Sequence, residues 1–127
     1  MDSCTEIGFV KKCIKKEYRE RLLFELQSKK HRAKALSRLA HISEDVLRDG
    51  YLNLSVLEFQ KQFAPKMSST EKCYLISDSD HDGETMLLTE AILFCQTSYM
   101  LVVLIACDFV VIKPEIEKKS TFYVFLS

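Results

Sequence analysis

The chain has few of the residues that mark a specialised class of protein. It contains no tryptophan, three glycines and two prolines among 127 residues, and 47% of it is hydrophobic, so a collagen-like or largely disordered chain is excluded. Its five cysteines form no Cys-x-x-Cys pair and its three histidines are scattered, which gives zinc no clustered ligands. The amino terminus shows no secretory signal. We expect a reduced, cytoplasmic protein with a single domain over residues 1–127.

Net charge is also absent, since 18 basic and 18 acidic residues cancel. The two halves nevertheless differ: residues 1–50 carry 12 basic and 8 acidic side chains, and residues 51–127 carry 6 and 10. Such a bipolar surface favours a protein partner or self-association. The densest basic stretch, residues 29–38, has no aromatic residues between its charges, so we do not expect nucleic-acid binding.

Apolar residues recur every three or four positions through most of residues 1–64, as on one face of a helix. The spacing predicts one long amphipathic helix over residues 5–28 and a second helix that Asp49 and Gly50 end. The two helices should join near Lys29 and Lys30 as a helical hairpin or a bent pair. Ser55 followed by Glu58 predicts a short capped helix over residues 55–63. This part of the chain should be mainly helical.

Residues 72–127 show the order strand, helix, strand, strand. Residues 73–77 are an apolar strand, and a helix is predicted over residues 84–96. Residues 100–112 are nearly all apolar and rich in β-branched side chains, which indicates two strands that meet near Cys107 and Asp108, or one bent strand, and a last strand is predicted over residues 121–126. The fold class is therefore α+β, with two N-terminal helices and a third packed on a small, mostly antiparallel sheet.

One apolar stretch is long enough to span a bilayer. Residues 92–112 contain a single charge, Asp108, over 21 positions. Polar residues interrupt the middle of the stretch, and no basic cluster flanks it. We therefore expect no membrane segment.

Three aspartates at alternate positions, Asp78, Asp80 and Asp82, are followed by Gly83. Carboxylates at this spacing can meet one hard cation, and glycine permits a sharp turn, as at the start of a calcium loop. An EF-hand would also need a preceding helix and a glutamate at the twelfth loop position, where Thr89 stands. The three aspartates are candidate ligands for Mg²⁺, Mn²⁺ or Ca²⁺ outside an EF-hand.

The surrounding sequence, ISDSDHDGETMLLTEAI at residues 76–92, resembles the aspartate motif of the Toprim domain of type II topoisomerases and primases. It is less closely similar to the first motif of DHH phosphoesterases. The resemblance implies that Asp78, Asp80 and Asp82 hold Mg²⁺ or Mn²⁺ for phosphodiester chemistry. A structural alternative is that Asp80 or Asp82 caps the following helix by accepting hydrogen bonds from its first N–H groups.

No complete catalytic set is visible in the rest of the chain. There is no Gly-x-Ser-x-Gly nucleophile elbow, and no cysteine has sequence neighbours that would lower its pKa. We therefore expect a non-enzymatic protein-interaction or regulatory protein without a cofactor. The alternative is a metal-dependent phosphodiester or phosphoester enzyme that acts through the three aspartates.

Overall fold

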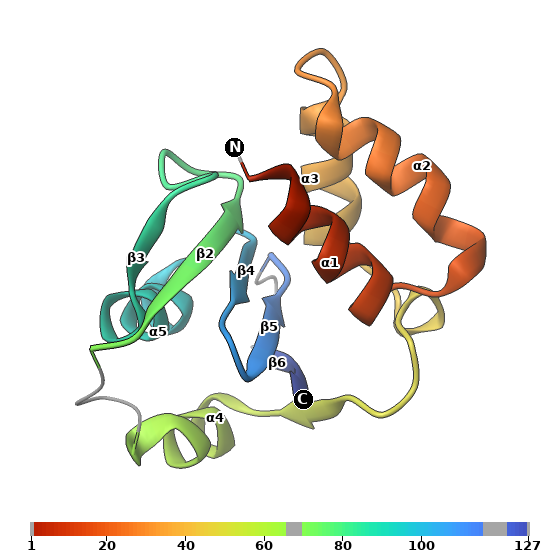
Figure 1. Cartoon of the computed structure of the whole chain (residues 1–127). Helices are drawn as coiled ribbons and strands as arrows, with labels where there is room; N and C mark the ends of the chain where they lie inside the picture. Colours follow the sequence, from red (N-terminus) through yellow and green to blue (C-terminus); the bar gives the residue numbers. More distant parts are fainter. Residues whose placement is uncertain (1, 66–69, 116–121, 127) are drawn as a thin grey trace.

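The protein folds as helices on both faces of an antiparallel sheet. The computed structural model describes residues 2–65, 70–115 and 122–126. The sheet in these residues has the strand order β1-β6-β5-β4-β2-β3, and every neighbouring pair is antiparallel (Figure 1), which confirms the α+β class. The strands are β1 Leu52–Leu54, β2 Lys72–Ser77, β3 Thr85–Leu87, β4 Val102–Ile105, β5 Phe109–Lys113 and β6 Phe122–Leu126.

Three helices cover one face of the sheet and two cover the other (Figure 1). The first group is α1 Ser3–Cys13, α2 Lys16–Gln27 and α3 Arg32–Ala40, and the second is α4 Val56–Phe63 and α5 Leu88–Thr97. In β5, Phe109 and Val111 pack toward α4 and α5, whereas Val110 and Ile112 pack toward α1–α3. Alternate side chains of a strand point to opposite faces, so a sheet covered on both faces needs the unbroken apolar runs seen in the sequence.

The predicted long helix over residues 5–28 is wrong in one respect, because the chain breaks between α1 and α2. Ile14 leaves the helix and forms an antiparallel bridge with Leu47, and the Lys15 N–H donates to the Val46 carbonyl at 2.9 Å. Ile14 is fully buried there. Neither glycine nor proline marks the break, which depends on pairing with a segment 33 positions further along the chain.

The second predicted helix is shorter than expected and ends at Ala40. The segment that follows forms a 3₁₀ turn, η1 Glu44–Val46, in which the Ser43 side chain accepts a hydrogen bond from the Asp45 N–H. Gly50 has a φ of +94°, a conformation that favours glycine, but it lies in a bend before β1 and does not end the helix as predicted. The predicted hairpin is confirmed: α2 and α3 pack side by side (Figure 1).

Helix α4 follows its local sequence signals closely. Ser55 and Glu58 form the predicted capping box, in which each side chain accepts from the other residue's backbone N–H. The ring of Phe59 stacks on Phe122 of β6 with centroids 4.2 Å apart, and this contact joins the helix to the sheet.

The C-terminal part matches the predicted order except at its first helix. Residues 85–87 form strand β3, paired with β2, and α5 begins only at Leu88. The two strands predicted within residues 100–112 are confirmed as β4 and β5, and the last strand is confirmed from Phe122. Strands β1 and β3 extend the sheet beyond the prediction. The polar run at residues 66–71, which the sequence predicts to be a loop, and residues 113–120, which contain Pro114 and are predicted to be a turn, lie partly outside the described residues.

No helix among the described residues is long and apolar enough to cross a bilayer. Residues 92–112 divide instead between α5, β4 and β5.

Lys113 is a fully buried charge at the end of β5. Its ammonium group donates a hydrogen bond to the carbonyl oxygen of Ser98, the C-cap residue of α5. The negative end of a helix dipole favours a cation at this position. Burial lowers the pKa of Lys113, and the nearby Cys95 and Glu115 oppose that effect.

Because the pKa of Lys113 is lower in the folded state, the unfolded state binds more protons between the folded and unfolded pKa values. The free energy of unfolding contributed by this residue should therefore rise as pH rises toward 10.5. We expect the free energy of unfolding of the wild type to rise relative to that of Lys113→Met between pH 7 and pH 10, as measured by urea unfolding. Lys61→Met, which removes an exposed lysine, is the matched control. A difference that stays constant with pH would contradict the prediction.

Candidate functional site

The three aspartates lie in the hairpin loop between β2 and β3, which we call the aspartate loop (residues 78–84). Gly83, at a φ of +79°, donates its N–H to the Leu75 carbonyl at 2.9 Å and closes the loop. Asp78 and Asp80 are exposed, whereas Asp82 is half-buried and turned toward the helices. The structure therefore separates Asp82 from the other two carboxylates by environment.

The capping interpretation of the loop is wrong. Helix α5 begins at Leu88, and its N-cap residue Leu87 makes no side-chain capping hydrogen bond. Strand β3 stands between the aspartates and the helix start. Asp82 instead accepts a hydrogen bond from the Ser77 N–H at 3.0 Å, which fixes the loop to the end of β2.

Arg32 of α3 is the partner that holds Asp82 in place. Its Nε donates to Asp82 Oδ2 at 2.7 Å and its Nη2 to Asp82 Oδ1 at 2.9 Å, in a two-point contact. The same guanidinium makes a second two-point contact with Glu6 of α1, both bonds at 2.8 Å, and its Nη1 also donates to the Leu26 carbonyl at 2.9 Å. These contacts use all five N–H groups of an arginine.

Two further groups complete this buried cluster, which we call the Arg32 network. The Tyr74 hydroxyl donates to Glu6 Oε2 at 2.6 Å and accepts from the Asp2 N–H at 3.2 Å. Burial, followed by the hydrogen bond to Glu6, raises the pKa of Tyr74 to about 12. Burial alone would lower the pKa of Arg32, but its hydrogen bonds to Asp82 and Glu6 outweigh that effect and raise it.

In the sequence, Arg32 is one of several cations of the basic stretch at residues 29–38, and nothing sets it apart from its neighbours. The arginine is only 8% exposed, and its partners Glu6 and Asp82 are 26 and 50 positions away in the chain. No local pattern identifies such a residue. The only signal was that residues 28–42 contain basic side chains and no acidic ones, so that any neutralising carboxylate had to come from elsewhere.

The aspartate loop shows no preformed cation site among the described residues. No group of three His, Cys, Asp or Glu side chains within residues 2–65, 70–115 and 122–126 is arranged to hold a metal ion. His81, between two of the aspartates, contacts Glu84 at 2.9 Å and packs its ring against Phe94 with centroids 5.0 Å apart.

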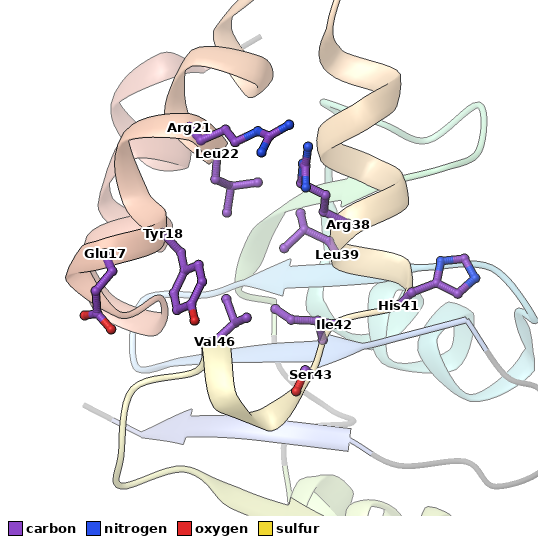
Figure 2. A pocket seen from close by; sticks show the side chains of 10 residues that line it. All are labelled: Glu17, Tyr18, Arg21, Leu22, Arg38, Leu39, His41, Ile42, Ser43 and Val46. Atoms are coloured by element: carbon purple, nitrogen blue, oxygen red, sulfur yellow. The ribbon is translucent and has the colours of Figure 1, made fainter.

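A cleft of about 520 Å³ lies between α2, α3 and the segment that leads into η1 (Figure 2). Its floor is apolar and is made by Leu22, Leu39, Ile42 and Val46. Leu22 and Leu39 are buried, whereas Ile42 and Val46 are partly exposed. Tyr18 stands at one side, 44% exposed. The helical spacing of the apolar residues predicted that these side chains belong to the core. It could not predict that α3 ends early and leaves some of them partly exposed.

Two arginines close one end of the cleft. Arg21 of α2 and Arg38 of α3 point toward one another above the apolar floor (Figure 2). Both bind the same carboxylate, that of Glu25, which is 4% exposed. The Arg38 Nε lies 2.8 Å from Glu25 Oε1, whereas the Arg21 Nε lies 3.9 Å from Glu25 Oε2. One buried carboxylate therefore faces two guanidinium groups, and the looser one is largely exposed.

Removal of the central cation should destabilise the fold strongly. Arg32→Met leaves the carboxylates of Glu6 and Asp82 without a countercharge, and breaking a buried ion pair in this way costs about 3–5 kcal/mol. Lys34→Met, an exposed change on the same helix, should cost no more than about 0.5 kcal/mol. Chemical denaturation measures both. If Arg32→Met fails to fold, Asp82→Asn, which keeps the Glu6 contact, supplies a milder test, and a wild-type stability in either Arg32 or Asp82 variant would contradict the role of the network.

The metal hypothesis for the aspartate loop remains a prediction, and metal titration tests it. A ligand that binds only the folded state raises the unfolding midpoint. Because Arg32 engages Asp82, we expect millimolar Mg²⁺, Mn²⁺ and Ca²⁺ to shift the midpoint equally in wild type and in Asp78→Ala/Asp80→Ala. A shift seen in the wild type and lost in the double variant would instead establish the loop as a metal site.

Comparison with protein-family models, with curated proteins and with solved structures finds no significant match. The function of the chain therefore has to be inferred from its own geometry, that is from the aspartate loop, the Arg32 network and the cleft.

Proposed function

We propose that this protein is a non-enzymatic interaction module that binds a partner protein in the cleft between α2 and α3. The observation that carries the proposal is the cleft itself, an apolar hollow of about 520 Å³ with charged groups at its edge. Binding sites in proteins are typically concave, mostly apolar and supplied with a few polar groups that fix orientation. The cleft has this character, and it opens on the surface of the helical layer.

The aspartate loop supports an interaction role better than a catalytic one. Asp82 is committed to Arg32 and to the Ser77 N–H, so a cation at the loop would compete with these bonds for the third carboxylate. Two-metal phosphodiester chemistry needs carboxylates that are free to hold the ions. The loop is thus better suited to joining the sheet to the helices than to chemistry.

A cytoplasmic location is part of the proposal. All five cysteines are free thiols, with Cys13, Cys73 and Cys95 buried. Burial raises the pKa of each of these three to about 12, which suppresses the reactive thiolate. Free thiols of this kind suit a reducing compartment.

Partner recovery with a cleft variant tests the proposal. Tyr18→Ala/Ile42→Ala trims the cleft without removing a fully buried side chain, and Leu57→Ala, at an exposed position of α4, is the matched control. We expect immobilised wild type and the control to retain the same partner from an extract of the native host, and the cleft variant to retain about ten-fold less, as expected when interface anchors are removed.

Circular dichroism establishes that the variants are folded, and light scattering reports self-association. Equal recovery by the cleft variant would show that the partner binds elsewhere. A strictly monomeric protein that recovers no partner would contradict the interaction role altogether.

A further inference from the structure

We infer that the segment bound in the cleft is acidic and amphipathic, with an apolar side chain on the floor and a carboxylate on the Arg21–Arg38 pair. This inference rests on the proposed function and adds the chemical class of the partner. It depends on three observations: the uneven charge of the two cleft walls, the incomplete neutralisation of the arginines and the apolar floor.

The charge of the cleft is uneven. Its α3 wall carries Arg38 and His41, with Lys34 one turn before Arg38 on the exposed side of the helix, and His41 lies 3.3 Å from the carboxylate of Glu115. No acidic residue occurs between positions 28 and 42. The α2 wall carries Glu17 one helical turn before Arg21, on the side of the cleft that faces away from Arg38 (Figure 2). A negatively charged group is therefore attracted to the arginine end and repelled from the other.

The two arginines are not fully neutralised by the protein itself. A guanidinium presents five N–H donors, and Glu25 accepts from Arg38 at 2.8 and 3.4 Å, while Arg21 reaches it only at 3.9 Å. The Arg21 side chain is 73% exposed. Glu17 and Glu20 also lie beside Arg21, but in the described part of the chain the hydrogen bonds of Glu25 go to Arg38, which leaves N–H donors of Arg21 available at the mouth of the cleft. Arginine forks of this kind match a carboxylate in a two-point contact.

The apolar floor favours a protein segment over a nucleic acid. Ile42 and Val46 offer aliphatic contact beside the buried Leu22, and this suits a leucine or phenylalanine side chain better than a sugar-phosphate backbone. Single-stranded nucleic acids need aromatic platforms along a basic groove, and here Tyr18 is the one aromatic residue in a lining that also contains Glu17. An amphipathic helix with a carboxylate one turn from its apolar anchors meets both requirements.

Selection from a displayed library of random twelve-residue peptides tests the inference. We expect the enriched sequences to place Asp or Glu within one helical turn of a bulky apolar residue. A synthetic peptide of the consensus should bind the wild type and lose about ten-fold or more in affinity for Arg21→Gln and for Arg38→Gln, measured by fluorescence anisotropy. Lys61→Gln, the same loss of charge on the opposite side of the sheet, should bind as the wild type does.

The outcomes separate the two proposals. Peptides that need Tyr18 and Ile42 but not the arginines would overturn the acidic partner and keep the cleft as the binding site. Peptides that bind Tyr18→Ala/Ile42→Ala unchanged would overturn both, as would the absence of any enriched sequence. Tight binding of a single-stranded oligonucleotide that requires Arg21 and Arg38 would replace the peptide with a nucleic acid. Concentration-dependent self-association abolished by Arg21→Gln would make the occupant a second copy.

Discussion

The structure depends on one buried cation. Arg32 is the only link among the described hydrogen bonds that joins α1, the end of α2, α3 and the aspartate loop at a single point. Removing an arginine and two carboxylates from water costs free energy, and the attraction between them offsets this cost only when the geometry is good and every donor is used. Here every N–H of the guanidinium has an acceptor, and the cluster as a whole holds one negative charge more than it holds positive. The network therefore specifies how the helical layer sits on the sheet rather than adding much net stability.

This constraint also decides what the aspartate loop can do. In sequence the three aspartates are equivalent, and in the fold they are not, because Asp82 turns inward and Asp78 and Asp80 stay in solvent. Two hydrogen bonds hold the loop to β2, from the Gly83 N–H to Leu75 and from the Ser77 N–H to Asp82, while the outer carboxylates of the loop remain exposed. The sequence of the motif thus resembles that of a catalytic loop, whereas the contacts of Asp82 connect the sheet to the helical layer.

Local signals in the sequence predicted what is local in the structure. Ser55 and Glu58 predicted the start of α4 because a capping box involves only residues three positions apart, and the apolar runs predicted β4 and β5 because both faces of the sheet are covered. The helix breaks at Ile14 because Ile14 pairs with Leu47. Strand β3 forms because it pairs with β2, and Arg32 is buried because it binds Asp82. These are pairings between distant segments, and periodicity carries no information about them. For the same reason the sequence could not predict that Asp82 separates from Asp78 and Asp80, since charge and spacing do not say which carboxylate turns inward.

The cleft follows from the same distant pairing that breaks the first helix. To bring Leu47 opposite Ile14, the chain must leave α3 at Ala40 and turn through η1. A helix continued to position 49 would have carried Ile42 and Val46 along its buried stripe. Because the helix stops early, these two side chains lie at its end and are partly exposed to solvent. They share the cleft with Tyr18, Arg21 and Arg38. A binding surface therefore arises where a tertiary contact overrides helical periodicity, which is why it was invisible to the pattern that identified its residues as core.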